Sequence, residues 1–378
     1  MPKRINKALL VYVLFAVILL VVPTFVGGDA YLLNKFSRYL ALGILAVALS
    51  LSWGYGGILN LGQGVTFGIG AYGIAMYLKL AASASNPGGL PDFMGWNNVS
   101  SLPWFWQPFH HLSFALLAGI GIPVLVAIVL GWFMFRARIV GVFVAIITLA
   151  MLVVTNLLFI DQQRYTGGFN GMTNLAILKV GPVSLDPYSL TFYYFASGLL
   201  IVILLAGFYI VNSKFGLVLR AIKENPDRVR FLGYDVAIYQ TVAFAISGAM
   251  AAAAGMLYAM VLQFASPTFM GVALSLSVVI WCAVGGRDSL LAAAIGAILV
   301  NALQGTLSNQ FLDTAQLLLG AVFVLVVLFL PRGLAGISEV FARKAKRSAP
   351  AVVAGAQATG RLKPEAPDRK PGKHAEVR

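Results

Sequence analysis

The stretch NSKFGLVLRAIKENPDRVRFLGYDVAIY, residues 212–239, is a long polar interruption between the apolar blocks of the second half of the chain. In its first half, apolar residues recur at the spacing of one helical face, at Phe215, Val218, Leu219 and Ile222. This spacing predicts a short amphipathic helix, because residues three and four apart lie on the same side of an α-helix. The basic residues Arg220 and Lys223 fall off that apolar stripe. We call residues 212–239 the bracket.

The Asn225-Pro226 pair divides the bracket into two helices. A residue before proline is disfavoured in the α conformation, so the first helix ends here. Asparagine is a favoured N-cap and proline a favoured first helical residue, so the same pair starts a second helix, with Asp227 in its first turn. Gly233 is placed to end that helix in the left-handed conformation. Such a charged helix pair fits either a handle gripped by a soluble partner or an ordinary basic loop, and the residues alone leave both open.

The composition excludes a soluble globular protein. Hydrophobic residues make up 60% of the 378 residues and charged residues only 11%, whereas soluble domains carry about 25% charged residues. Near-uncharged runs of about 20 residues match the thickness of a bilayer. In lipid such runs must be helical, because every backbone polar group needs an internal partner. The sequence therefore predicts an all-α, polytopic membrane protein.

Patterns that carry chemistry are scarce in this chain. The single cysteine, Cys282, excludes an intrachain disulfide and a four-cysteine metal site. With only three histidines, at His110, His111 and His374, we expect no metal centre. No paired carboxylates and no nucleophile with a base are recognisable, so we expect no enzyme activity. The net charge of +14 fits basic residues gathered on the cytoplasmic side of a membrane better than a nucleic-acid partner.

The apolar runs predict about ten spans, and the first, after MPKRINK, is too long for the core of a cleaved signal peptide. The spans lie near residues 8–27, 39–58, 62–82, 112–133, 140–160, 188–211, 240–264, 272–286, 289–308 and 314–331. If the N-terminus is cytoplasmic, 22 Lys and Arg fall on the inner side and 5 on the outer side, as the positive-inside rule requires. Both termini and the bracket then face the cytoplasm.

This topology divides the chain into two parts. We expect residues 1–340 to form the transmembrane domain, with the bracket as its cytoplasmic helix pair. Residues 341–378 alternate Lys and Arg with Ala, Pro and Gly, which predicts a disordered cytoplasmic tail that contacts anionic membrane lipid.

Amide side chains are the main polar groups within the predicted spans. Asn60 and Gln63 lie in WGYGGILNLGQGVTFGIGAYG, residues 53–73, which has eight glycines and fits either tight helix packing or a broken helix beside a solute path. Gln263, Asn301 and Gln304 lie in or near later spans. A buried amide is costly unless paired, so each is either an interhelical contact or a solute contact. No acidic residue falls inside a span, which disfavours a proton- or sodium-driven carrier.

Two outer loops carry distinctive residues. The first, residues 83–111, contains the aromatic cluster LPWFWQPFH at 102–110, which fits the membrane interface or a docking patch for an outer partner. The second, residues 161–187, contains TGGFNGMTN at 166–174. Its glycines lack the Gly-Lys-Ser/Thr of a phosphate-binding loop, so we interpret it as a turn-rich rim loop. From the residues, a transport subunit with a coupling bracket leads over a passive channel or a self-sufficient carrier.

Several motifs in one order resemble the permeases of the branched-chain amino acid and urea ABC importers, over roughly residues 35–337. They are GYGGILNLGQGVTFGIGAY, TGGFNGMTN, RAIKENPDRVRFLGY followed by ISGAMAAAAGMLYA, VGGRDSLLAAAIGA and LFLPRGLAGI. Within this family WGYGGILNLGQG, RFLGY, VIWCAVGGR and the tryptophan-rich loop look more like the urea-type permease. The resemblance therefore implies a urea importer subunit, with a branched-chain amino acid permease as the alternative.

The resemblance also implies partners. This chain would assemble in the bacterial inner membrane with a homologous permease, two cytoplasmic ATPases and an extracytoplasmic solute-binding protein, and ATP would be bound by the ATPases. The bracket would be the element that enters a groove on an ATPase, with contacts from Arg220, Glu224, Asn225, Val229, Phe231 and Gly233. The wider importer pattern has Glu-Ala-Ala with a glycine six residues after the glutamate. Here Glu224 precedes Asn-Pro and Gly233 lies nine residues later, so the resemblance transfers the location but no residue role.

Overall fold

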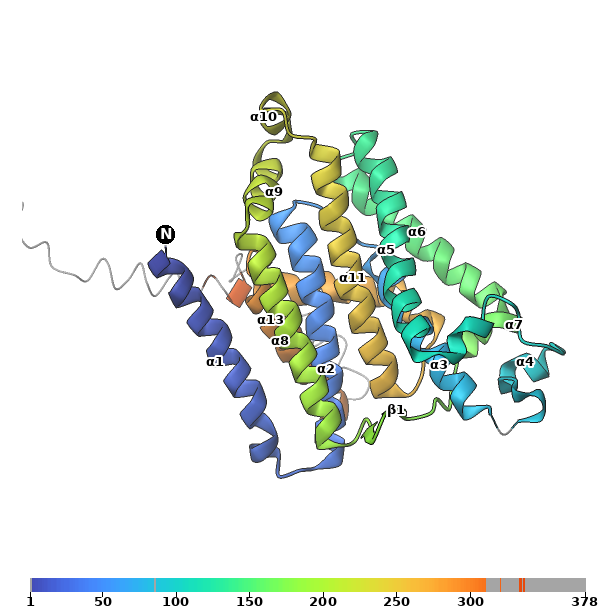
Figure 1. Cartoon of the computed structure of the whole chain (residues 1–378). Helices are drawn as coiled ribbons and strands as arrows, with labels where there is room; N and C mark the ends of the chain where they lie inside the picture. The colour runs from blue at the N-terminus through green and yellow to red at the C-terminus, as the bar shows by residue number, and fades with distance from the viewer. Residues whose placement is uncertain (1, 85, 311–319, 321–332, 335, 337–378) are drawn as a thin grey trace, which may run out of the picture. The chain divides into compact units, whose positions relative to one another are not determined.

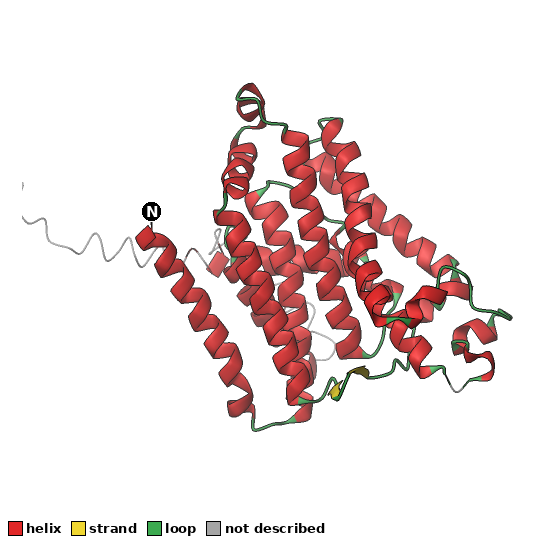
Figure 2. Ribbon diagram, viewed as in Figure 1, coloured by secondary structure: helices red, strands yellow, loops and turns green. Residues whose placement is uncertain are grey.

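The computed structural model describes residues 2–84, 86–310, 320, 333, 334 and 336. The predicted tail and, apart from residue 320, the predicted tenth span near 314–331 lie outside these residues. The described chain is mostly helical (Figures 1 and 2). Its longer helices are α1 (Pro2–Val26), α2 (Ala30–Leu49), α3 (Gln63–Ala82), α5 (Leu112–Arg136), α6 (Val142–Asp161), α8 (Leu190–Asn212), α11 (Val236–Leu262), α12 (Val272–Gly285) and α13 (Leu290–Gln310).

Short elements connect these helices. They are a π-helical turn η1 (Ser50–Tyr55), the 3-10 turns η2 (Pro87–Gly89), η3 (Gln107–His110), η4 (Gly168–Asn170) and η5 (Pro267–Met270), the short helices α4 (Asp92–Trp96), α7 (Gln163–Thr166), α9 (Lys214–Glu224) and α10 (Pro226–Phe231), and the strands β1 (Leu178–Val180) and β2 (Val183–Leu185). The two strands form an antiparallel hairpin that the all-α prediction did not include. A two-residue turn with Gly181 at φ +60° joins them, and glycine suits such a turn because it adopts positive φ readily.

Seven of the described helical stretches are long and apolar enough to cross a membrane: Ala30–Tyr55, Gln63–Ala82, Leu112–Arg136, Val142–Asp161, Leu190–Asn212, Val236–Leu262 and Leu290–Leu307. Shorter apolar helices cover Leu9–Phe25 and Val272–Gly285. Each of the first nine predicted spans thus coincides with a helix. The 14 residues of α12 extend over only about 21 Å, so α12 is shorter than the hydrocarbon core of a bilayer.

The start of α2 differs from the prediction. The second span was expected to begin near residue 39, but α2 begins at Ala30, where the Asp29 side chain accepts hydrogen bonds from the main-chain N–H groups of Tyr31 and Leu32. Lys35 and Arg38, which we had assigned to an outer loop, therefore lie within the helix. The hydropathy pattern did not include Lys35 and Arg38 in the span, because two charged residues within four positions are typical of a loop.

Small residues set the packing at the centre of the bundle, where α11 contacts α3, α5 and α2. Gly70 abuts Ala252, Gly73 abuts Gly119, and a β-carbon at Gly255 would overlap the carbonyl oxygen of Phe67. The predicted small surface along α3 is therefore an interface at which helix backbones approach closely, as in other membrane bundles.

A buried cation holds the loops at the rim remote from the bracket. Lys79 of α3 is buried, forms an ion pair with Asp92 at 2.9 Å, and donates to the Thr173 carbonyl at 2.7 Å. Next to it, Met172 and Ala265 exchange main-chain hydrogen bonds. The loop 166–174 is thus fastened to both α3 and the start of η5, and forms the rim that its turn residues predicted.

Replacing Gly255 with alanine should destabilise the protein by about 1–3 kcal/mol, because the added methyl group meets backbone rather than a flexible side chain. The matched control is Gly198→Ala on α8, where nothing lies within 4 Å of the added carbon. There, alanine's higher helix propensity should make the change neutral or stabilising by up to about 1 kcal/mol. Thermal unfolding in detergent micelles measures both, and equal midpoints would contradict the packing described.

Candidate functional site

The bracket forms the two helices that its sequence predicts. Asn225 caps α10, with its side-chain oxygen accepting from the Arg228 N–H at 3.0 Å, and Pro226 is the first helical residue. Gly233 has φ +87°. Its N–H donates to the Arg230 carbonyl and the Tyr234 N–H to the Val229 carbonyl, which is the paired hydrogen-bond pattern of a Schellman C-cap. Local sequence therefore determines both ends of α10.

The apolar face of the bracket turns inward. Ile222, Val229 and Val236 are buried together, with Val218 and Tyr239 packed against them. Val229 was expected to contact an ATPase, but its side chain is only 4% exposed and packs inside the bracket. Phe231 and Leu232, at the tip of α10, are 91% and 75% exposed. This tip is therefore an exposed apolar surface of the bracket, as is Leu217 of α9, which is 68% exposed.

Lys223 ties the bracket to two other parts of the bundle. Lys223 Nζ donates to the Gly54 carbonyl of η1 at 2.6 Å and forms an ion pair with Asp288, in the turn between α12 and α13, at 2.9 Å. Nearby, the Arg220 guanidinium lies 5.1 Å from the centre of the Tyr55 ring. Ser50 at the start of η1 donates to the Arg287 carbonyl at 2.9 Å. We call Lys223, η1 and the Arg287–Asp288 turn the hub.

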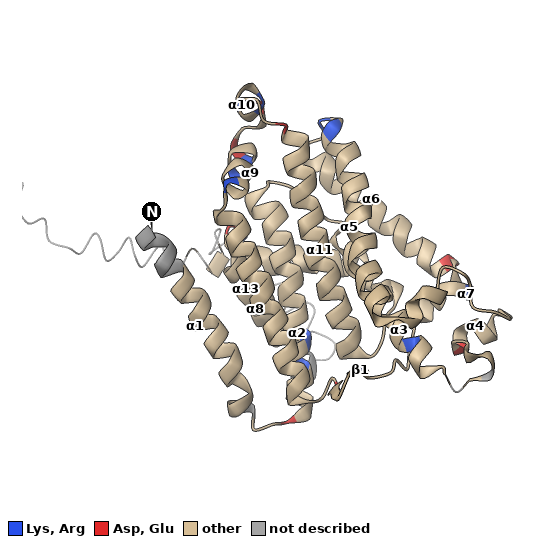
Figure 3. Cartoon of the chain, viewed as in Figure 1, with Lys and Arg blue, Asp and Glu red and all other residues tan. Residues whose placement is uncertain are grey.

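Positive charge gathers at the bracket end of the bundle (Figure 3). The described basic residues there are Arg136, Arg138, Lys214, Arg220, Lys223, Arg228, Arg230 and Arg287. Arg136 pairs with Asp235 at 3.1 Å, and Arg230 pairs with Asp227. Between the α5 end and α10 lies a groove of about 510 Å³ that Arg136, Arg138, Arg230 and Gly233 help to line. Glu224, the remaining predicted coupling residue, is exposed on α9.

Between η1 and α3 the chain leaves the helical conformation inside the bundle, and side chains satisfy its backbone. Leu61 N–H donates to Thr148 Oγ1 at 3.1 Å, Gly62 N–H to Asn60 Oδ1 at 2.9 Å and Gly64 N–H to Ser275 Oγ at 3.2 Å. Non-helical backbone at membrane depth is tolerated only where it finds such partners. We call residues 56–62 the broken segment.

The two predicted amides of this region belong to the same network. Asn60 Nδ2 donates to Gln63 Oε1 at 2.6 Å, and Gln63 Nε2 donates to the carbonyl and hydroxyl oxygens of Ser247. The space beside Asn60 measures only about 10 Å³, which is room for a single water. In this conformation Asn60 and Gln63 therefore act as interhelical contacts.

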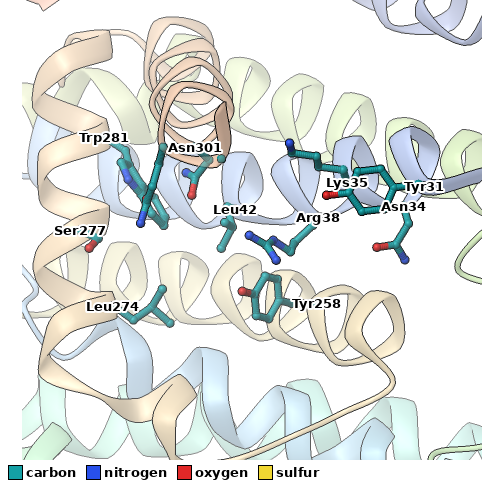
Figure 4. A pocket seen from close by; sticks show the side chains of 12 residues that line it. Tyr31, Asn34, Lys35, Arg38, Leu42, Tyr258, Leu274, Ser277, Trp281 and Asn301 are labelled. Atoms are coloured by element: carbon teal, nitrogen blue, oxygen red, sulfur yellow. The ribbon is translucent and has the colours of Figure 1, made fainter. Parts of the chain in front are cut away.

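The other three predicted amides divide between two places. Gln263 ends α11 in the left-handed conformation, with φ +51°. Asn301 and Gln304 of α13 line a cavity of about 430 Å³ between α2, α11, α12 and α13. Figure 4 shows that Lys35 and Arg38 of α2 reach into the same cavity. Sequence reasoning missed these two cations as site residues because it placed them outside the membrane. The Asp29 cap is the signal that points to an earlier helix start.

Residues 31–327 match the family described as the permease component of the branched-chain amino acid transport system. The chain belongs to this family of permeases. It is 26% identical over 318 residues to the high-affinity branched-chain amino acid transport system permease protein LivM of Salmonella typhimurium, covering 77% of this chain and 67% of that protein. The match to LivM of Escherichia coli has the same identity and coverage.

A probable branched-chain amino acid transport permease protein, LivH, of Methanocaldococcus jannaschii is 29% identical over 153 residues, which is 38% of this permease and 48% of the relative. No solved structure matches the chain. The named relatives support the branched-chain amino acid interpretation better than the urea interpretation of the sequence. Family membership and the apolar helices together make the chain a multi-pass membrane permease and a transport subunit.

Lys223→Gln should loosen the bracket without unfolding the permease. It removes the ammonium that joins Gly54 to Asp288, and loss of one charged hydrogen bond at a partly buried site costs about 1.5 kcal/mol. Amide hydrogen exchange in α9 should accelerate about tenfold. Lys214→Gln, at an exposed position of the same helix, is the matched control and should leave exchange unchanged. Equal exchange rates in the two variants would contradict the bridging role of Lys223.

Proposed function

We propose that this permease is the membrane subunit of an ATP-driven importer for branched-chain amino acids. The family match over residues 31–327 carries the proposal. The substrate class follows from the relatives, which are named as branched-chain amino acid transport permeases. In this assignment the chain works with a second permease, two cytoplasmic ATPases that bind the ATP, and an extracytoplasmic solute-binding protein.

The bracket is the proposed contact with the ATPase. Its tip offers Phe231 and Leu232, two exposed apolar side chains beside basic residues, and an aromatic anchor of this kind suits a pocket on a soluble partner. A movement imposed on the tip reaches the bundle through Lys223, which contacts both η1 and the α12–α13 turn. We assign this end, with both termini, to the cytoplasmic side, and the excess of Lys and Arg at this end supports that assignment.

The positions of the acidic residues favour transport that is not driven by an ion gradient. In the described part of the chain, acidic residues occur only in loops, at helix ends, or in the short helices outside the bundle. Carriers driven by protons or sodium usually need a carboxylate or an equivalent ion site inside the bundle. Coupling to ATP through a partner requires no such site.

Uptake into proteoliposomes tests the function. The permease, reconstituted with its candidate partner subunits and leucine-loaded binding protein, should accumulate radiolabelled L-leucine only when ATP is present on the ATPase side. Urea should not accumulate. Leucine uptake by the permease alone, independent of ATP, would contradict the proposal in favour of a channel or carrier, and ATP-dependent uptake of urea without leucine would contradict the substrate.

Phe231→Asp should abolish co-purification of the ATPase while leaving the permease folded, because the side chain is 91% exposed and an aspartate cannot occupy an apolar pocket. The matched control is Phe169→Asp, which changes another exposed phenylalanine at the rim remote from the bracket. That variant should retain the ATPase. If the ATPase remains bound to the Phe231 variant, the tip of α10 is not the contact surface.

A further inference from the structure

The cavity between α2, α11, α12 and α13 combines features that the proposed function does not explain. Most of its lining lies in the halves of these helices remote from the bracket, at the start of α2, the end of α11, the first half of α12 and the second half of α13, and Leu42 and Trp281 lie past the midpoints of α2 and α12. Its volume of about 430 Å³ falls within the range of about 300–1,000 Å³ typical of small-molecule sites. It is therefore large enough for an amino acid.

Two cations of α2 dominate its polar lining. Lys35 and Arg38 lie within a predominantly apolar helix, where charged side chains are costly and usually serve a functional site. Within the described residues neither has an ion-pair partner, since the ion pairs there involve Lys79, Arg136, Lys223 and Arg230. Among the described residues that line the cavity, none is acidic.

Buried donors at this position lack acceptors. Arg38 Nε and the Tyr39 hydroxyl are shielded from solvent and have no hydrogen-bond partner among the described residues. A buried donor without a partner costs about 1–3 kcal/mol, so Arg38, which lines the cavity, is a donor available to an acceptor atom of a ligand, whereas Tyr39 lies beside Gly305 and does not line the cavity. Figure 4 shows the Arg38 guanidinium extending from α2 into the cavity, toward its centre.

The remaining lining has two kinds of groups. Asn34 and Asn301 use their amide nitrogens to donate to main-chain carbonyls, at 3.1 Å to Val261 and 2.8 Å to Ala297 respectively, so their oxygens remain as acceptors. Leu42, Leu274 and Trp281 provide apolar surface. A carboxylate suits the guanidinium, which binds it through two parallel hydrogen bonds. An ammonium suits the amide oxygens, and an aliphatic side chain suits the apolar wall.

We propose that this cavity is a solute site in the permease itself, which binds the carboxylate of an aliphatic amino acid through Arg38, with Lys35 as a second cation. The identity of the ligand rests on the proposed function. The site deepens that function, because specificity then resides in this chain as well as in a binding protein. Urea, which has no charge, would leave both cations without a counter-charge.

Direct binding to the permease alone, in nanodiscs without ATP or partners, tests the proposal. Trp281 lines the cavity, so its fluorescence reports occupancy, and Trp281→Phe identifies its share of the signal. L-leucine should change the signal saturably, and 4-methylpentanoate, which keeps the carboxylate, should compete. The amine 3-methylbutylamine, which lacks the carboxylate, and urea should not compete.

Variants locate the site. Arg38→Gln should weaken leucine binding about tenfold or more, as loss of a charge-assisted pair predicts, and Arg38→Lys should restore part of the affinity. Lys179→Gln removes an exposed cation from β1 and is the charge-matched control that should bind normally. Thermal unfolding shows whether Arg38→Gln remains folded. If Arg38→Gln is unstable, the partial recovery of leucine affinity in Arg38→Lys still tests the role of the positive charge.

Three results would overturn the proposal: competition by 3-methylbutylamine as strong as by leucine, unchanged affinity in Arg38→Gln, or competition by inorganic phosphate or phosphatidylglycerol stronger than by leucine. The third would assign the cavity to a lipid headgroup. Because binding needs neither ATP nor partners, leucine binding without ATP-driven uptake would refute the proposed function alone. ATP-driven uptake without leucine binding would refute the cavity site alone.

Discussion

The contacts of Lys223 are the interaction on which the position of the bracket against η1 and the α12–α13 turn depends. Its ammonium group, carried on α9, contacts the η1 carbonyl of Gly54 and the carboxylate of Asp288. Close packing reinforces it, since a β-carbon at Gly54 would overlap the Arg287 carbonyl and one at Gly57 would lie 3.2 Å from Lys223 Cγ. With no space between these segments, the bracket, η1 and the α12–α13 turn form one contiguous body.

α12 extends this body through the bundle. Its end adjoins Arg287 and Asp288 of the hub, Ser275 accepts from the Gly64 N–H in the first turn of α3, and Ser277 and Trp281 line the cavity. A rigid helix of 14 residues thus links the bracket end to the proposed solute site. A displacement of the bracket by an ATPase would tilt α12 and change the cavity, which is the kind of discrete packed linkage that coupling between distant sites requires.

The elements predicted well from the sequence are those that local chemistry determines. The Asn225 cap, the Pro226 start and the Gly233 end of α10 are all encoded within nine residues, and the apolar spans follow from hydropathy. The small residues of α3 also lie at interfaces as predicted. These features depend on residues that are neighbours in the chain, so a single sequence contains enough information to place them.

What the sequence did not reveal depends on partners far along the chain. Gln63 finds Ser247, 184 residues away, so its amide could not be assigned to packing rather than solute binding. Val229 seemed a surface residue because nothing local shows that Ile222 and Val236 cover it. Arg38 was predicted to lie in a loop because its charge and that of Lys35 lower the mean hydropathy of this part of the chain. The cavity that it lines could not be predicted because four helices from distant parts of the chain form it. Tertiary structure, not local propensity, decides each of these.

A reversible covalent link tests most directly whether the bracket and η1 move together. The double variant Gly57→Cys/Lys223→Cys provides this link. A Cβ at residue 57 lies 3.5 Å from Cβ of residue 223, which is within the range for a disulfide. Residue 57 has φ +69°, so a cysteine there costs about 1–2 kcal/mol of backbone strain. Cys282 is buried and should not interfere. The account predicts ATP-dependent leucine uptake in the oxidised assembly, loss of uptake on reduction because Lys223 is absent, and recovery on reoxidation. The opposite result, leucine uptake by the reduced form and no uptake by the oxidised form, would show that the bracket and η1 must separate during transport. It would contradict the proposal that they move together.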